Sequence, residues 1–130
     1  MTGDNHLELG RKAENMAAEY VERLGWRILS RNFCCRLGEL DIVAMDEREK
    51  ELVVVEVRYR TIGDVQSPAD SIGPKKLRTL VSAGRVYVND IGWTGPWRVD
   101  LMGVTAHPRE PSERWKLEHI ENITDGAFRA

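Results

Sequence analysis

Two segments of the chain, 39–45 and 52–59, alternate as β-strands do and carry charged side chains among apolar ones. Because side chains two positions apart share a face of a strand, Glu56 and Arg58 point to the same side of the second segment. A run of polar residues separates the segments and predicts a turn, so the two strands should pair as an antiparallel hairpin. With Asp41 on the first strand, the hairpin predicts a site where carboxylates meet a guanidinium.

Glu56 needs a physical reason, because the valines on either side of it predict a buried strand. Burying an unpaired charge costs several kcal/mol even after relaxation. Two kinds of partner can compensate the carboxylate: a bound cation, or Arg58 together with other arginines. The first predicts a metal centre, and the second predicts a structural ion network of Asp41, Glu56 and Arg58.

A metal centre needs oxygen ligands, since Mg²⁺ takes carboxylates, water and phosphate oxygens. Asp41 and Glu56 meet that need, and Glu14 adds a third carboxylate from a helix. A metal held there would activate a water and neutralise charge on a phosphodiester. Arg58 would bind the phosphate or stabilise the transition state.

The helix that carries Glu14 spans about 7–24, where apolar residues recur at helical spacing. Glu14 lies beside this apolar stripe, so it can face neighbouring structure. A second helix begins near Pro74, a residue that suits the first helical position, and ends near Asn89. Further strands are predicted at 26–33, 97–104 and 115–123. The order α-β-β-β-α-β-β predicts an α/β fold in which a mixed central β-sheet is flanked by helices.

Basic residues gather in two stretches that contain no acidic residue, although the chain as a whole is acidic. The residues are Arg23, Arg27, Arg31 and Arg36 in the first stretch and Lys75, Lys76, Arg78 and Arg85 in the second. Such clusters contact phosphates and make binding sensitive to salt. We expect Arg31, Arg36, Arg60, Lys75 and Lys76 to bind nucleic acid, and solvated surface charge is the alternative.

Length and composition limit the possible classes of protein. The chain has 130 residues, of which 42% are hydrophobic and 31% charged, as in one soluble globular domain. The net charge of −2 excludes a uniformly basic nucleic-acid binder. The two cysteines, Cys34 and Cys35, are adjacent, so they predict neither a disulfide framework nor a zinc site. No window approaches the ~18 apolar residues of a membrane helix, so we expect a cytoplasmic protein.

Several motifs follow one another along the chain in the order of a known family. They are Gly10, Ala13-Glu14, Arg31-Asn32, Gly38-Glu39-Leu40-Asp41, Val55-Glu56-Val57-Arg58-Tyr59-Arg60, Lys75, Trp97-Arg98-Val99-Asp100 and His119-Ile120-Glu121-Asn122. The hairpin motifs resemble the carboxylate core of the PD-(D/E)-x-K nuclease superfamily. The whole chain resembles the YraN-type family of uncharacterised proteins, whose fold is similar to that of archaeal Holliday-junction resolvases.

This resemblance implies one restriction-endonuclease-like domain over 1–130, with 1–6 and 124–130 as loose termini. It matches Glu14 to the helix glutamate of the resolvase-like site, Asp41 to the central aspartate and Glu56 to the acidic residue before the catalytic basic position. Arg58 stands where those nucleases have lysine, and arginine does not give up its proton. Lys75 is then the candidate for the missing amine.

The preferred interpretation is a nucleic-acid-binding protein that hydrolyses DNA, including branched DNA, with Mg²⁺ or Mn²⁺ at Glu14, Asp41 and Glu56. Its catalytic residues would also include Arg58 and Lys75. The first alternative is a non-catalytic nucleic-acid-binding module with an Arg58-centred ion network, and the second is a protein-interaction scaffold. A homodimer is compatible with each. Salt-dependent DNA binding separates the scaffold from the others, and metal-dependent cleavage separates the enzyme from the module.

Overall fold

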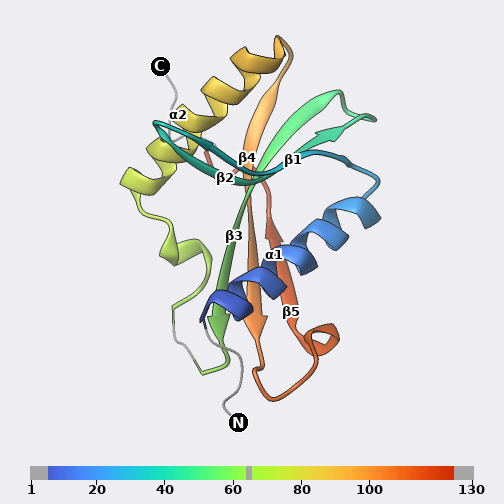
Figure 1. The fold of residues 1–130 in the computed structure, drawn as a ribbon, viewed down its shortest axis with the longest axis vertical. Helices are drawn as coiled ribbons and strands as arrows, with labels where there is room; N and C mark the ends of the chain where they lie inside the picture. The colour runs from blue at the N-terminus through green and yellow to red at the C-terminus, as the bar shows by residue number, and fades with distance from the viewer. Residues whose placement is uncertain (1–5, 64–65, 125–130) are drawn as a thin grey trace.

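The computed structural model describes residues 6–63 and 66–124, which form a β-sheet with a helix on each side (Figure 1). The elements are α1 (His6–Arg23), β1 (Arg27–Cys35), β2 (Gly38–Asp46), β3 (Glu51–Thr61), α2 (Pro74–Ile91), β4 (Trp97–Ala106) and β5 (Lys116–Ile120), with short 3₁₀ turns at Ala69–Ser71 and Ser112–Arg114. The predicted α/β class and the predicted order of elements are confirmed. Of the termini expected to be loose, 1–5 and 125–130 lie outside the described residues.

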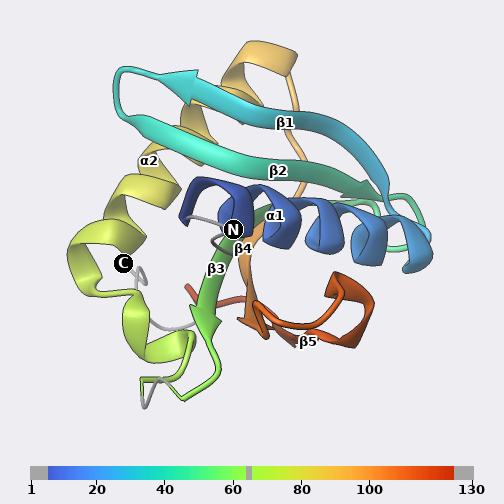
Figure 2. The same cartoon turned by 60° about the horizontal axis from the view of Figure 1, so that its bottom comes forward.

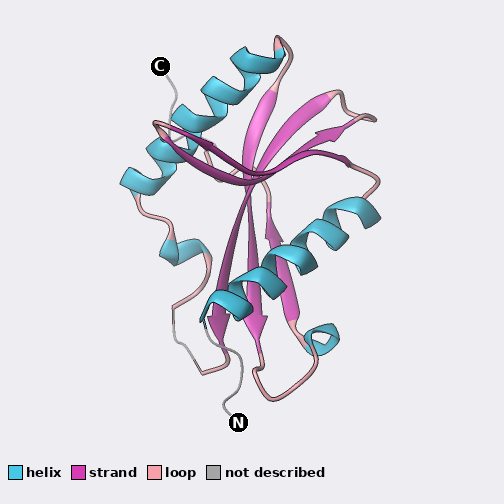
Figure 3. Cartoon of the chain, in the orientation of Figure 1, coloured by secondary structure: helices cyan, strands magenta, loops and turns pink. Residues whose placement is uncertain are grey.

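The five strands of the sheet follow chain order, β1 to β5 (Figure 3). Neighbouring strands are antiparallel except β3 and β4, which run parallel because α2 crosses between them. The predicted hairpin of β2 and β3 is present, and its ladder runs from Asp46 opposite Glu51 to Ile42 opposite Val55. The sheet is therefore mixed, as predicted.

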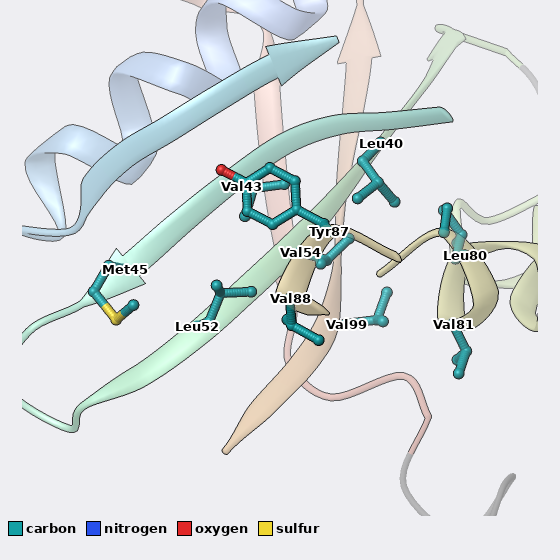
Figure 4. Close-up of a cluster of buried hydrophobic side chains, with 11 residues drawn as sticks. Leu40, Val43, Met45, Leu52, Val54, Leu80, Val81, Tyr87, Val88 and Val99 are labelled. Carbon is teal, nitrogen blue, oxygen red and sulfur yellow. The ribbon is translucent and has the colours of Figure 1, made fainter. Parts of the chain in front are cut away.

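Each helix covers one face of the sheet, and β3 contributes buried side chains to the hydrophobic clusters on both faces. Val53 and Val55 pack against α1, whereas Leu52 and Val54 pack against α2. The α2 side is the larger cluster and includes Tyr87 (Figure 4). Figure 2 shows α1 below the hairpin of β1 and β2. Because both faces of β3 are buried, a polar residue in this strand must find its partners inside the protein.

Strict alternation fails in β2 at Asp41. Alternation predicts that Leu40 shares a face with Ile42, but Leu40 packs with Val43 in the α2-side cluster and Ile42 packs on the α1 side. The ladder between β2 and β3 ends just before this point, at Ile42 opposite Val55. Beyond it β2 is no longer held in register with β3, so its side chains are free to turn.

The edge strand β1 is also irregular at this level. Its register with β2 shifts between Ile28 and Ser30, and Asn32 adopts a left-handed backbone conformation with φ of 56°. Asparagine tolerates that conformation better than most residues. By the flanking pairs, Asn32 lies opposite Asp41. Two adjacent strands therefore depart from regular geometry where the charged residues gather.

The strand boundaries differ from prediction by a few residues. β1 extends through both cysteines to Cys35, and β5 is shorter than predicted. It ends at Ile120, before Asn122, which adopts a left-handed backbone conformation and donates its N–H to the carboxylate of Asp100. Both thiols are free. Among the described residues, no helix is long and apolar enough to span a bilayer.

Candidate carboxylate pocket

Carboxylates from three elements line one open pocket of about 290 Å³: Glu14 of α1, Asp41 of β2 and Glu56 of β3. Two basic residues, Arg58 of β3 and Lys76 of α2, line it as well. We call this the carboxylate pocket. It lies where β2 separates from β3, so residues far apart in the chain can reach a common space.

Asp41 is held by the backbone of the neighbouring strand. Its Oδ2 accepts a hydrogen bond of 2.8 Å from the N–H of Val57. The regular ladder ends at Ile42 opposite Val55, so no backbone carbonyl of β2 continues the ladder to the N–H of Val57. The side chain of Asp41 accepts that N–H instead. This contact fixes the carboxylate beside Glu56, which stands opposite Asp41 if the register is continued.

Glu56 is 5% exposed, and its compensation by positive charge is incomplete. Oε2 lies 3.1 Å from Nε of Arg58 and 3.8 Å from Nζ of Lys76. Burial, followed by the charge of Asp41 and a hydrogen bond with it, nevertheless raises the pKa of Glu56 to about 8, against the opposing effect of Lys76 and Arg58. Three carboxylates line the pocket against two basic side chains, so the pocket is short of positive charge.

Arg58 does not clamp both carboxylates. Its Nε is buried and has no hydrogen-bond acceptor, although Oε2 of Glu56 lies 3.1 Å away. At this distance the donor must be poorly directed, so the contact is an ion pair without a hydrogen bond. The bidentate clamp of Asp41 and Glu56 that arginine chemistry allows is not formed.

Glu14 completes the acidic side of the pocket from α1. Burial, and next the charge of Asp41, raises the pKa of Glu14, while Arg31 and a hydrogen bond from Asn32 act in the opposite direction. The left-handed conformation of Asn32 thus brings a donor to Glu14. The sequence places Asn32 within a motif but indicates no role for it, because its contact with Glu14 depends on a left-handed backbone conformation.

The amine in this pocket belongs to Lys76 and not to Lys75. Lys75 is exposed and does not line the pocket, whereas Lys76 is half-buried and reaches Glu56. Both residues lie in the first turn of α2, which begins at Pro74. Successive residues of a helix point about 100° apart, so only one of them can face the sheet. The sequence predicts Lys75 as this amine, but which of the two lysines faces the sheet depends on how α2 docks.

The other predicted nucleic-acid-binding residues lie outside the carboxylate pocket. Arg31 lines a neighbouring pocket that shares Glu14 with it, and its Nη2 donates to Oδ1 of Asn15 at 2.9 Å. Arg36 is exposed in the turn after β1. Arg60 lines a pocket on the other side, next to Arg58.

A second group of charged residues surrounds Asp100 of β4, which is fully buried. Nε and Nη2 of Arg98 donate to its two oxygens at 2.8 and 3.1 Å, Nε2 of His119 donates at 2.8 Å, and the N–H of Asn122 donates at 2.8 Å. Burial alone would raise the pKa of Asp100, but the bonds from His119, Arg98 and Asn122 hold it below its usual range. Asp100 lies among apolar residues of a strand, as Glu56 does, so the same sequence signal that singles out Glu56 applies to it.

Asp100, His119 and Glu121 place one potential metal ligand atom each within 4.8 Å of one another. Both oxygens of Asp100 are already used by Arg98 and by other donors. A fixed guanidinium in that position opposes a cation. We interpret the group as a structural network that ties β5 and the residues after it to β4.

The donor set of the carboxylate pocket does fit a hard divalent cation. Glu14, Asp41 and Glu56 present only oxygen ligands, which Mg²⁺ and Mn²⁺ prefer. Burial and, next, the charge of Asp41 raise the pKa of Glu56, and the Nε–H of Arg58 is a buried donor without an acceptor. A cation and an anion placed together in the pocket would relieve both features.

Comparison with known proteins places the chain in a family. Proteins called UPF0102 protein from Pelotomaculum thermopropionicum, Nitrosococcus oceani and Carboxydothermus hydrogenoformans are similar to it. They are 47%, 38% and 35% identical over 116, 112 and 123 residues, which cover 88%, 85% and 93% of this chain and 92%, 89% and 98% of theirs. The family model described as Uncharacterised protein family UPF0102 matches residues 13–104, which include every residue of the pocket that carries charge. The predicted YraN-type resemblance is confirmed, and the chain belongs to the UPF0102 family.

Proposed function

We propose that this protein binds nucleic acid and hydrolyses phosphodiester bonds with a divalent cation, Mg²⁺ or Mn²⁺, in the carboxylate pocket. The observation that carries the proposal is the meeting of Glu14, Asp41 and Glu56 from three elements in one open pocket that is short of positive charge. A buried carboxylate beside two half-buried ones is costly to the fold, and such clusters of perturbed groups are typical of functional sites.

The residues of the pocket divide into ligands and phosphate-binding groups. Asp41 and Glu56 would hold the cation, with Glu14 as the third carboxylate. The bound ion supplies a water of lowered pKa and neutralises charge on the phosphate. Lys76, whose Nζ lies 3.8 Å from Oε2 of Glu56, would contact the reacting phosphate from the α2 side of the pocket. Arg58 remains cationic and stabilises the negative charge that develops on the phosphate oxygens.

DNA is the proposed substrate because of the nuclease-like arrangement and the basic residues near the pocket. Arg31 lines the pocket on one side and Arg60 the pocket on the other. A strand crossing the site would meet a positive charge on both sides of the carboxylates. The resemblance to Holliday-junction resolvases supports branched DNA as one substrate to test.

A non-catalytic nucleic-acid-binding module is the second candidate, favoured by the 3.1 Å ion pair of Arg58 with Glu56. In that case Arg58 and Lys76 replace the cation, and the basic surface alone is functional. Substitution by lysine removes the planar guanidinium and keeps the charge. If the ion pair blocks the metal site in the wild type, Arg58→Lys should weaken the pair and restore metal-dependent cleavage.

The test is cleavage of duplex, single-stranded and branched DNA with Mg²⁺ or Mn²⁺ by the wild type, Arg58→Lys and Asp41→Asn. Asp90→Asn is the matched control, because Asp90 is exposed near the end of α2. We expect cleavage by the wild type or by Arg58→Lys, and loss of cleavage in Asp41→Asn but not in Asp90→Asn.

No metal-dependent cleavage by either the wild type or Arg58→Lys, with DNA binding intact, would contradict the enzyme and leave the binding module. Absence of salt-dependent DNA binding would contradict both and favour a protein-interaction scaffold.

A further inference from the structure

A second pocket adjoins the carboxylate pocket, and Arg58 and Tyr59 line both. It has a volume of about 300 Å³, and its other polar side chains are Arg60, Gln66, Ser67 and Ser71. We call it the arginine pocket. It brings two guanidinium groups together with hydroxyls and an amide, and none of the described residues that line it is acidic. That composition suits an anion.

Arg60 is fixed in this pocket by its own contacts. Its Nη1 donates to the carbonyl oxygen of Gln66 at 2.9 Å, and its Nε donates to Oγ1 of Thr105 at 3.3 Å. Thr105 lies on β4 directly opposite Arg60 in the parallel ladder. The positive charge is therefore placed before any ligand arrives, which reduces the entropic cost of binding.

The outer wall of the arginine pocket is an ordered turn. Pro68 is buried against Gly103 of β4, where a Cβ would lie 2.3 Å from the proline ring. Oγ of Ser67 accepts a hydrogen bond from the N–H of Asp70 at 3.3 Å, and Oγ of Ser71 donates to the carbonyl oxygen of Pro68. The turn thus holds its hydroxyl groups beside the two arginines.

Arg58 connects the two pockets electrostatically. Its Nε faces Glu56 at 3.1 Å, while the side chain as a whole is 34% exposed and lines both pockets. Guanidinium groups bind phosphate through planar, paired hydrogen bonds. An anion in the arginine pocket would find such donors on the exposed part of this side chain.

We propose that the arginine pocket is a phosphate-binding subsite for a nucleic-acid strand that also reaches the carboxylate pocket. Because Arg58 and Tyr59 line both pockets, consecutive phosphates of one strand can occupy them. The inference rests on the proposed function for the phosphate in the carboxylate pocket. Binding in the arginine pocket requires neither a metal nor cleavage.

The test introduces a negative charge at Ser67. In Ser67→Asp the new carboxylate still accepts the N–H of Asp70, so the turn keeps its bond. Ser67→Asn keeps the shape without the charge. Ser112→Asp is the matched control, because it adds the same charge in the turn before β5, away from this pocket. Equal melting temperatures of the four proteins verify that folding is intact.

Two probes distinguish a strand from free phosphate. The affinity of a short fluorescein-labelled DNA strand is measured by anisotropy in EDTA, and inorganic phosphate is titrated while the amide signals of residues 60 and 66–71 are followed by NMR. We expect DNA affinity to fall roughly tenfold in Ser67→Asp, since a unit charge within a few ångströms of a phosphate is strongly repulsive. Ser67→Asn and Ser112→Asp should stay within about twofold of the wild type.

Equal DNA affinity of Ser67→Asp and Ser112→Asp would overturn the subsite. If inorganic phosphate shifts these amide signals while Ser67→Asp binds DNA as tightly as the wild type, the pocket binds free phosphate, and the proposal that it binds a nucleic-acid strand is wrong. Because EDTA removes the metal, these outcomes are independent of cleavage. If the wild type cleaves DNA but Ser67→Asp does not weaken DNA binding, only the subsite is contradicted. If Ser67→Asp weakens DNA binding but the wild type does not cleave DNA, only the nuclease activity is contradicted.

Discussion

Glu56 and Asp41 are two neighbouring carboxylates in a pocket whose positive charge comes from Lys76 and Arg58. The pKa of Glu56 rises to about 8, chiefly through burial and secondly through Asp41. Ionising Glu56 therefore costs more free energy in the folded protein than in the unfolded chain. The unfolded chain, in which the carboxyl ionises near its ordinary pKa of 4.5, binds fewer protons above that pH.

The first prediction concerns this pH dependence in the absence of metal. Between pH 4.5 and 8 the carboxyl of Glu56 ionises in the unfolded chain but stays largely protonated in the folded protein. The free energy of unfolding of the wild type should therefore fall progressively as pH rises through this range. Glu56→Gln lacks that contribution, so at pH 8 it should be more stable than the wild type by on the order of 4 kcal/mol. Urea denaturation in EDTA at several pH values measures the difference. A variant that is less stable at pH 8 and equal at pH 5 would show that Glu56 is satisfied as an ion.

The second prediction uses the adjacent lysines as a matched pair. Lys76 reaches the carboxylate pocket and Lys75 is exposed, so only Lys76→Met should remove a group that acts on the reacting phosphate. The rate of metal-dependent DNA cleavage should fall about 10²–10³-fold in Lys76→Met, as for other electrostatic deletions. Lys75→Met should retain the rate. Equal losses in both variants would mean that charge at the start of α2, and not the pocket amine, matters.

At the scale of elements, the separation of β2 from β3 creates the site. The ladder ends at Ile42 opposite Val55, and Asp41 then binds the N–H of Val57. Periodicity in the sequence predicted the helices, the strands and the hairpin, because alternation and helical spacing are local properties. The sequence-based reasoning missed the break at Asp41, which moves Leu40 to the other face, because that break depends on where two strands part.

The same limit applies to the candidate site. Glu56 could be singled out from sequence because a carboxylate among valines needs a partner wherever the strand lies. The choice of Lys76 over Lys75 and the role of Asn32 depend on how a helix docks and on one left-handed residue. Neither is visible in composition or spacing.

The third prediction concerns the network that joins β4 and β5. Asp100 accepts bonds from Arg98, His119 and Asn122, and removing its charge takes the nearest counter-ion from the half-buried Arg98 and leaves it with Glu51 and Glu121. Asp100→Asn should lower the free energy of unfolding by about 3 kcal/mol at neutral pH. Asp90→Asn, which changes an exposed carboxylate, should cost less than about 0.5 kcal/mol. Urea denaturation of both variants checks this.

The pH dependence of the same variants gives an independent check. The pKa of Asp100 is held below its ordinary value of 3.8, so its contribution to stability is present above that pH and is lost as pH falls below it. The wild type should therefore lose stability on acidification more steeply than Asp100→Asn. If the folded Asp100→Asn protein lost DNA binding as well, the network would belong to the binding surface, contrary to our interpretation.

At the scale of the whole molecule, three adjoining pockets place basic residues on both sides of the carboxylates. The pocket that contains Arg31 shares Glu14 with the carboxylate pocket, which in turn shares Arg58 with the arginine pocket. The net charge of −2 over the chain hides this distribution. Affinity for a polyanion depends on the local arrangement of charges.

The fourth prediction tests that arrangement through salt. Arg31→Ala should weaken DNA binding and reduce the slope of log affinity against log salt by about one, because one phosphate contact is lost. Arg48→Ala is the matched control, since Arg48 is exposed in the turn between β2 and β3 and lines none of the three pockets. Anisotropy titrations over a range of salt concentrations give both slopes. An unchanged slope in Arg31→Ala would place the basic binding surface elsewhere.

Binding of a divalent cation by the carboxylate pocket is the claim on which the proposed activity depends, and calorimetric titration with Mn²⁺ tests it most directly. The wild type and Asp90→Asn should each bind Mn²⁺ at a site that Asp41→Asn lacks, with all three proteins equally folded by circular dichroism. No binding of Mn²⁺ by the wild type, or equal binding by Asp41→Asn, would contradict the account.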